Sequence, residues 1–164
     1  MSIKEKTKIK LRNLIDDLID NPDINASYFV DYWNENDEDP FQWKVVVNGP
    51  VGSPYEGGYF KLKVKFPDDF PTSAPTVKFE TKIYHCNVSD TGNICLNKLT
   101  NWKPDYKMKD IFEDIYYMLD KQNPDDAYSN EEGKNKGTEY KNEREEFNRK
   151  ARKYVDSYAR LNQL

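Results

Sequence analysis

The residues best suited to chemistry lie close together in the chain: His85, Cys86, Asn87 and Cys95. A cysteine thiol with a pKa of about 8.5 is partly ionised at neutral pH and is intrinsically a strong nucleophile. A neighbouring amide can donate a hydrogen bond to the oxyanion that forms when such a thiol attacks a carbonyl carbon. With two cysteines and one histidine in the whole chain, the usual zinc ligand sets are excluded. The grouping therefore contains the residue types that acyl transfer through a thiol needs, with no metal.

Three interpretations of Cys95 compete at this point. It could be an inert, buried cysteine between Ile94 and Leu96, a transferring nucleophile, or the nucleophile of a cysteine hydrolase that also uses His85 and Asn87. A lone histidine in a turn is more often a hydrogen-bonding support than a base, which disfavours the hydrolase. No basic residue closer than Lys98 follows Cys95, so a strongly lowered thiol pKa is not predicted.

The stretch from Ile83 to Pro104 that carries these residues shows no periodicity, and long irregular stretches inside a compact domain are often functional. Before it, apolar residues at helical spacing predict a helix from Thr7 to Asp20, which Asn21-Pro22 ends. Alternating apolar and polar residues predict strands at 43–48, 60–66 and 76–80, with an edge strand at 28–33. Short links between these strands favour an antiparallel meander of four strands.

Helical spacing returns at Met108 and continues to Leu119, and Asn123-Pro124 ends that helix. A polar stretch with glycines, Ser129 to Thr138, is interpreted as an extended loop. A last helix is expected from Tyr140 to Tyr158. No repeat or long linker divides the chain, so residues 1–164 are expected to form one α+β domain with an N-terminal helix, a sheet, an irregular segment and C-terminal helices.

Composition limits the classes of partner. The 164 residues carry a net charge of −4, which does not indicate a broad basic surface for nucleic acid. No apolar run approaches the roughly 20 residues that span a bilayer. The N-terminal residues do not resemble a signal peptide. We therefore expect a cytoplasmic or nuclear protein with reduced thiols and with neither nucleic-acid nor membrane partners.

The chain resembles the ubiquitin-conjugating enzyme family in five motifs that occur in the family's order. Relatives share a His-Pro-Asn tripeptide, a Gly-x-Ile-Cys-Leu segment, a Trp-x-Pro step, an Asn-Pro-Asp-Asp step, and an upstream Gly-Pro and Ser-Pro-Tyr-x-Gly-Gly segment. The matching residues here are 85–87, 92–96, 102–104, 123–126 and 49–58, and Phe70-Pro71 also fits the family. The similarity runs from the first helix to the last and implies the family's α+β fold.

The resemblance implies roles for individual residues. Cys95 would hold the modifier as a thioester, and Asn87 would either donate to the oxyanion or support the surrounding loop. Asp126 would orient and partly desolvate the incoming amine, because a normal aspartate is too weak a base to deprotonate a lysine alone. His85 and Asn101 would have supporting roles.

The resemblance also implies partners: ubiquitin, an activating enzyme, a ligase of RING type and protein substrates. Basic residues of the first helix would meet the activating enzyme, and the loops at 72 and 103–104 would meet the ligase. No cofactor would be bound, since ATP is used by the activating enzyme. The implied contact residues are Lys8, Lys10 and Arg12 for the activating enzyme and Thr72, Lys103 and Pro104 for the ligase.

The chain departs from the family pattern at several positions. Cys86 replaces the usual proline and adds a second thiol that could compete in labelling experiments. Thr72 stands where several ligase-binding relatives have a bulky aromatic, and Asp105 stands where a small residue is common. Two alternatives to a ubiquitin carrier therefore stay open: a carrier of a ubiquitin-like modifier such as NEDD8 or SUMO, and a non-catalytic binding module of the same fold. Cys95 disfavours the second.

Overall fold

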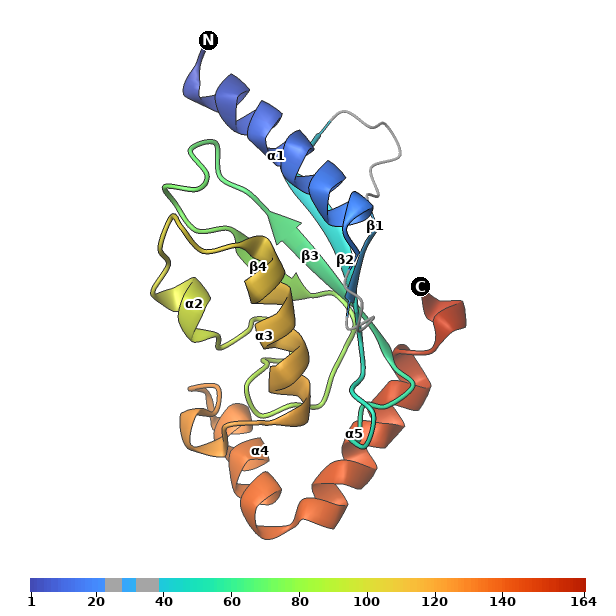
Figure 1. Ribbon diagram of the computed structural model, residues 1–164. Coiled ribbons are helices and arrows are strands. Elements are labelled where there is room, and N and C mark those ends of the chain that lie inside the picture. The colour runs from blue at the N-terminus through green and yellow to red at the C-terminus, as the bar shows by residue number, and fades with distance from the viewer. Residues whose placement is uncertain (23–27, 32–38) are drawn as a thin grey trace.

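The computed structural model describes residues 1–22, 28–31 and 39–164, which form an α+β fold as predicted (Figure 1). Helices flank the sheet in the sequence. The elements, in order, are α1 (Ile3–Asp20), β1 (Tyr28–Asp31), β2 (Gln42–Asn48), β3 (Tyr59–Lys65), β4 (Thr76–Phe79), α2 (Asn97–Thr100), α3 (Met108–Asp120), the 3-10 turn η1 (Pro124–Asp126), α4 (Glu131–Asn142), α5 (Arg144–Tyr158) and the 3-10 turn η2 (Leu161–Gln163).

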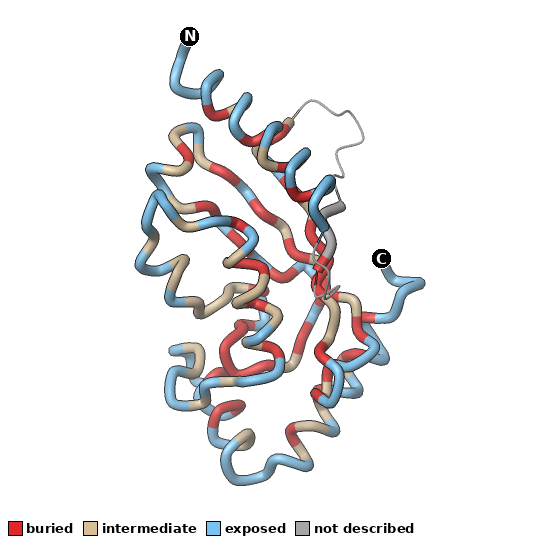
Figure 2. Tube along the Cα trace, viewed as in Figure 1, coloured by how far each residue is buried: buried red, intermediate tan, exposed pale blue. Residues whose placement is uncertain are grey.

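The four strands form an antiparallel meander in the order β1-β2-β3-β4, which confirms the predicted topology. Period-two alternation places Trp43 opposite Val64 and Leu62 opposite Phe79, so one face of the sheet is apolar. That face packs against α1 and α3, and buried residues gather between these layers (Figure 2). Positions 32–33 of the predicted edge strand lie outside the described residues, and positions 28–31 form β1.

Helix α1 begins four residues earlier than its apolar spacing predicts. The Ser2 hydroxyl accepts from the Glu5 backbone N–H at 3.2 Å, and the Glu5 carboxylate accepts from the Ser2 N–H at 2.7 Å. This reciprocal cap satisfies two N–H groups that a helix start otherwise leaves unpaired. Buried Leu11, Ile15 and Leu18 then fix the helix on the sheet. The cap, rather than the apolar stripe, therefore decides where the helix starts.

Two predictions for the C-terminal region are wrong. The extended loop predicted at 129–138 is mostly helix α4, capped by the Asn130 side chain, which accepts from the Gly133 N–H at 2.8 Å. The single last helix predicted from Tyr140 to Tyr158 is broken at Glu143, whose backbone is not helical. Tyr140 therefore belongs to α4. Its ring packs edge-on against that of Phe147 across the break, with 5.1 Å between the centroids.

Helices α4 and α5 lie at the end of the molecule opposite to the N-terminus of α1 (Figure 1). Helix α4 packs on η1 and on α5. Among the helices of the described ranges, none combines the length and the apolar character needed to cross a bilayer.

Candidate active site

Cys95 ends a short hairpin, residues 87–95, that leads into α2. The Cys95 N–H donates to the Asn87 carbonyl at 2.9 Å, and the Ser89 N–H donates to the Asn93 carbonyl at 2.9 Å. The tip turns at Gly92, which has a φ of +85°, and a Cβ there would lie 2.0 Å from the Phe79 carbonyl oxygen. Only glycine fits this close approach to β4. The hairpin therefore places Asn87 and Cys95 side by side at its base.

The Cys95 thiol faces the carboxylate of Asp126, which η1 presents. The Cys95 Sγ lies 3.7 Å from Asp126 Oδ2, and the thiol is half-buried while Asp126 is exposed. Partial burial raises the pKa of Cys95, and the negative charge and hydrogen bond of Asp126 raise it further. The absence of a lowered thiol pKa agrees with the sequence-based expectation. The structure thus brings the predicted nucleophile and the predicted amine-orienting residue together.

The Asn87 side chain ties the hairpin to the segment that carries Asp126. Its Nδ2 donates to the carbonyls of Asn123 and Asp126, each at 2.8 Å. Its Oδ1 accepts from the Asn123 N–H at 2.9 Å. Asn87 is buried, and both of its amide hydrogens are engaged in these two bonds. This geometry supports the loop-holding role; the oxyanion role stays a prediction.

Three consecutive buried residues, His85, Cys86 and Asn87, form the floor of the site. His85 is fully buried, its Nε2 lies 2.8 Å from the Met118 carbonyl, and its Nδ1 accepts from the Asn87 N–H at 3.0 Å. Burial lowers the pKa of His85 to about 4, so the ring is neutral near pH 7. Both ring nitrogens are already engaged with the backbone. This arrangement leaves neither nitrogen for Cys95 and argues against a hydrolase built on this pair.

Cys86 is also part of the floor. It is fully buried, and burial raises its thiol pKa to about 11. A buried, protonated thiol reacts slowly, so Cys86 is poorly placed to compete with Cys95 for labelling reagents. The burial of Cys86 therefore argues against the expectation that its thiol would compete with Cys95 in labelling experiments.

Gln122 and Tyr55 support the site through their side chains, and neither was assigned such a role from the sequence. The Gln122 Oε1 accepts from the Cys86 N–H at 3.0 Å, and its Nε2 donates to the Tyr55 hydroxyl at 2.9 Å. The Tyr55 hydroxyl in turn donates to the Tyr84 carbonyl. These bonds tie the segment before Cys86 to the end of α3 and to the turn after β2. Gln122 directly precedes the Asn-Pro-Asp-Asp motif, which is the one sequence signal that could have drawn attention to it.

Asn101 lies at the other end of the site, where it caps α2. Its Nδ2 donates to the Asn97 Oδ1 at 2.7 Å, so this exposed side chain is held along α2. The neighbouring Trp102 packs against the core, and its Nε1 donates to the Pro71 carbonyl at 2.8 Å. This bond joins the loop after α2 to the loop before β4. The supporting role of Asn101 toward a bound modifier stays a prediction.

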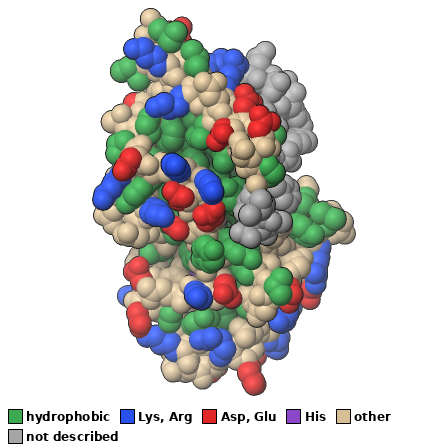
Figure 3. Space-filling view, viewed as in Figure 1, with side chains coloured by type: hydrophobic (Ala, Val, Ile, Leu, Met, Phe, Trp, Pro, Cys, Tyr) green, Lys and Arg blue, Asp and Glu red, His purple; other side chains and the backbone are tan. Residues whose placement is uncertain are grey.

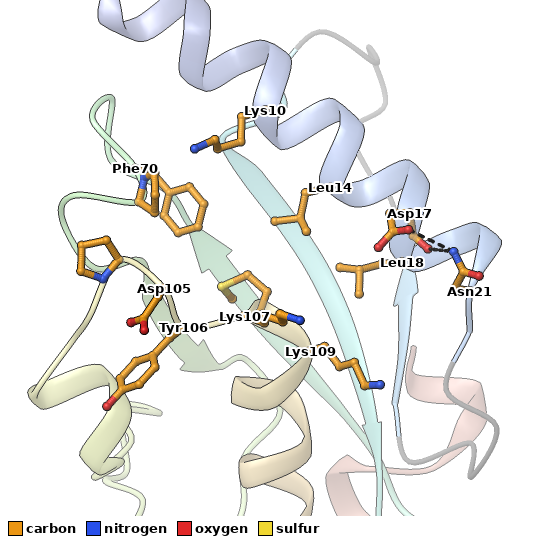
Figure 4. Close-up of a pocket in the computed structure, with 13 residues that line it drawn as sticks. Lys10, Leu14, Asp17, Leu18, Asn21, Phe70, Asp105, Tyr106, Lys107 and Lys109 are labelled. Carbon is orange, nitrogen blue, oxygen red and sulfur yellow. Dashed lines mark hydrogen bonds between the residues drawn. The ribbon is translucent and has the colours of Figure 1, made fainter.

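A second surface feature is a cleft of about 510 Å³ between α1 and the loops at 70–71 and 104–107. Hydrophobic side chains gather in this region beside α1, with charged side chains around them (Figure 3). Leu14 and Leu18 face the cleft from α1, with Phe70 opposite (Figure 4). Its charged lining residues are Lys10, Lys107, Lys109, Asp17 and Asp105.

The cleft collects only some of the predicted partner-binding residues. Lys10 and Pro104, predicted for the activating enzyme and the ligase respectively, line the same cleft. Of the remaining predicted contact residues, none lines the cleft; these are Lys8, Arg12, Thr72 and Lys103, of which the last three are exposed. The structure thus brings one residue from each predicted contact region to the cleft, without identifying a partner.

No group of three or more metal-ligating side chains occurs in the part of the chain that the structure describes.

Comparison with known proteins shows the family to which the chain belongs. The family model described as ubiquitin-conjugating enzyme matches residues 14–155. A probable ubiquitin-conjugating enzyme E2 31 of Arabidopsis thaliana is 39% identical over 126 residues, which cover 76% of this chain and 79% of that protein. Ubiquitin conjugating enzyme E2 B of Dictyostelium discoideum is 36% identical and covers 76% and 82% of the two chains. Ubiquitin-conjugating enzyme E2 14 of Schizosaccharomyces pombe is 37% identical, with coverage of 76% and 79%. The matched region contains both the hairpin and η1, and the chain belongs to the ubiquitin-conjugating enzyme family.

Proposed function

We propose that this protein accepts ubiquitin from the activating enzyme as a thioester on Cys95 and transfers it to a substrate lysine. The observation that carries this proposal is the half-exposed Cys95 thiol, held 3.7 Å from the Asp126 carboxylate at the base of the hairpin. An inert core cysteine would be buried, as Cys86 is. A non-catalytic module of the same fold would have no use for such a thiol.

The first step is a thioester exchange. The Cys95 sulfur attacks the carbonyl carbon of the modifier held on the activating enzyme. A new carbon–sulfur bond forms, the old one breaks, and the proton of the Cys95 thiol passes through solvent to the departing sulfur, which leaves as a thiol. The step conserves a thioester, so it needs no cofactor on this chain, and ATP is consumed earlier by the activating enzyme. Because the pKa of Cys95 is raised, only a small fraction of the thiol is ionised at pH 7.

The second step is aminolysis. A neutral lysine amine attacks the thioester carbon and a carbon–nitrogen bond forms. The carbon–sulfur bond breaks, the Cys95 sulfur leaves as a thiolate, and the proton given up by the nitrogen passes through solvent to that thiolate. The exposed Asp126 carboxylate attracts the arriving ammonium group and can accept a hydrogen bond from the amine as it loses its proton. Asn87 holds the backbone on which Asp126 sits. Its amide would serve the oxyanion only after one of its two Nδ2 bonds opened.

Partner docking is proposed for the cleft beside α1. Its apolar floor with a lysine-rich edge suits an apolar side chain flanked by acidic residues. The activating enzyme and a RING-type ligase would use this surface in turn. A ligase would be expected to accelerate transfer by fixing the loaded modifier, because no histidine base reaches Cys95. Thr72 offers no aromatic anchor, so the choice of ligase would depend on the exposed Lys103 and Pro104 instead.

The proposed cargo is ubiquitin, in line with the names of the relatives. Carriers of NEDD8 or SUMO are the alternative within the same fold, and a test with each modifier distinguishes them. We also propose a cytoplasmic or nuclear location, where activating enzyme and modifier would both be available.

The decisive assay mixes the full chain with activating enzyme, Mg-ATP and ubiquitin and resolves the products with and without reductant. We expect one adduct that reductant removes. It should be lost in Cys95→Ala and kept in Cys86→Ala, the matched control with the other thiol removed. If ubiquitin gives no adduct but NEDD8 or SUMO does, the cargo proposal is wrong and the carrier chemistry stands. If none of the three modifiers gives an adduct, the carrier proposal is wrong.

A further inference from the structure

Lys136 is a buried cation on α4, outside the residues used so far. Its side chain is 4% exposed, and its Nζ lies 2.7 Å from Glu132 Oε1 and 3.2 Å from Asp90 Oδ1. The ammonium also lies over the Tyr84 ring, 5.2 Å from the centroid. A lysine is rarely buried without charged partners, and here each partner comes from a different part of the chain. Glu132 is one turn away on α4, whereas Asp90 belongs to the active-site hairpin.

Asp90 lies in the turn at the tip of that hairpin. The Gly92 N–H donates to the Ser89 carbonyl at 2.9 Å and closes the turn around Asp90. The base of the same hairpin carries Asn87 and Cys95. The hairpin is therefore attached to the helical side of the site at two points. Asn87 attaches the base, and the Lys136–Asp90 ion pair attaches the tip.

Helix α4 also sets the position of η1, which carries Asp126. Two glycines on the buried face of α4 allow the helix to rest directly on this segment. A Cβ at Gly133 would lie 2.2 Å from the Tyr128 carbonyl oxygen, and a Cβ at Gly137 would lie 2.9 Å from the Pro124 carbonyl oxygen. Lys136 lies on the same buried face. One helix face thus touches both elements that meet at the Cys95 thiol.

We propose that Lys136 is a positioning residue for transfer of the modifier. Its ion pair with Asp90 fixes the hairpin that carries Cys95 to α4, and the segment that carries Asp126 packs on the same helix. This proposal rests on the proposed function, in which Asp126 orients the amine that attacks the thioester on Cys95. The Phe79 N–H donates to the Gly92 carbonyl at 2.9 Å, so the tip also rests on β4. Without the Lys136–Asp90 pair, the tip would stay with the sheet, and Asn87 at the base would remain to hold the hairpin to the helical side. The thiol and the carboxylate would then be held at their separation less firmly.

The two steps of the reaction should differ in their sensitivity to this change. Loading requires an accessible thiol and does not use Asp126. Discharge to an amine requires the thioester carbon and Asp126 to be in register, and small misplacements are costly in such oriented reactions. Loss of the Lys136–Asp90 pair should therefore slow discharge much more than loading.

The test uses Lys136→Met, which keeps most of the buried stem and removes the ammonium. Lys134→Met is the matched control, because Lys134 is exposed on the same helix. Asp90→Asn is a second variant that breaks the pair from its exposed side and leaves Lys136 with Glu132. Preloaded protein is chased with free lysine, and the single-turnover discharge rate is measured beside the loading rate. We expect discharge to fall about tenfold in both pair variants, with loading changed less than about twofold and the control unchanged.

A double-variant cycle separates positioning from general weakening of the fold. In an Asp126→Asn background, Lys136→Met should slow discharge less than about twofold, because the register that Lys136 maintains is no longer used. An equal loss in both backgrounds, or normal discharge in both pair variants, would overturn the inference. If the wild-type protein forms no thioester, the proposed function fails instead, so the two failures are distinguishable.

Discussion

Cys86 and Cys95 are nine residues apart in the chain and occupy opposite environments. Cys86 lies on the floor of the site, fully buried beside His85, with its N–H bonded to Gln122. Cys95 lies half-exposed at the surface of the site and faces the Asp126 carboxylate; these two residues form its mouth. Burial raises the pKa of Cys86 to about 11, and partial burial together with Asp126 raises the pKa of Cys95.

The comparison shows what would distinguish a carrier thiol, the role proposed for Cys95, from a buried one. Neither thiol has a lowered pKa, so ease of ionisation does not single out the nucleophile. The two thiols differ instead in their exposure, and Cys95 also lies beside a carboxylate that can receive an amine. The floor supplies rigidity, since His85 and Asn87 are buried there with their polar atoms bonded. A fixed floor and an open mouth therefore have separate functions, which variants can test separately.

The largest expected difference is in alkylation. With iodoacetamide at pH 7.5, Cys95 should react on the order of a thousandfold faster than Cys86, because Cys86 is both less ionised and accessible only after local opening. Mass spectrometry of the labelled peptides from the native protein measures both rates, and unfolding in urea supplies the control in which the two rates converge. Comparable rates in the native protein would remove the distinction between floor and mouth.

The second effect concerns the floor and the stability of the protein. The pKa of His85 is about 4 in the folded protein, below its ordinary value of 6.5. Above pH 6.5 both folded and unfolded states hold a neutral ring, so the contribution is fully present. As the pH falls from 6.5 toward 4, only the unfolded state takes up the proton, and the free energy of unfolding should fall by about 3 kcal/mol in total.

Urea unfolding at several pH values measures this loss, and His85→Gln provides the comparison. The variant lacks the titrating ring, so its free energy of unfolding should depend less steeply on pH in the same interval. Identical pH slopes for the two proteins would show that His85 is not held neutral by burial.

A smaller effect is expected at Asn87, the floor residue that is bonded to the backbone of Asp126 at the mouth. Asn87→Ala removes the three bonds to Asn123 and Asp126 and should lower the free energy of unfolding by about 2 kcal/mol. Discharge of the loaded modifier should slow as η1 loosens. If discharge slows while thermal stability is unchanged, Asn87 acts on the oxyanion instead of holding the loop. Thermal unfolding and single-turnover discharge, measured on the same preparation, separate the two roles.

Strong periodicity made much of the fold predictable. Helices α1 and α3 and strands β2 and β3 carry regular apolar spacing, and their predicted spans agree with the structure within a few residues. Cys95 and Asp126 were also identified from the sequence, through motifs that the family shares. The structure then placed the two side chains in contact, although they are 31 residues apart.

Features that depend on tertiary packing were not predictable from local pattern. Helix α4 contains two glycines and few apolar residues, which locally favour a loop. Those glycines are required because the helix rests on the backbone at Pro124 and Tyr128. The local sequence around Lys136 is similarly typical of a solvent-exposed lysine. The structure instead buries its side chain and pairs it with Asp90. Contacts between distant segments, rather than local propensity, decide both cases.

The most direct test of the central claim is the chemical nature of the bond at residue 95. With activating enzyme, Mg-ATP and ubiquitin, the wild-type protein should form an adduct that reductant cleaves, because a thioester links the modifier to Cys95. Cys95→Ser should give an adduct that resists reductant and is cleaved by mild base, since an oxygen ester replaces the thioester. A reductant-sensitive adduct that persists in Cys95→Ser would place the modifier on the other thiol and contradict the account.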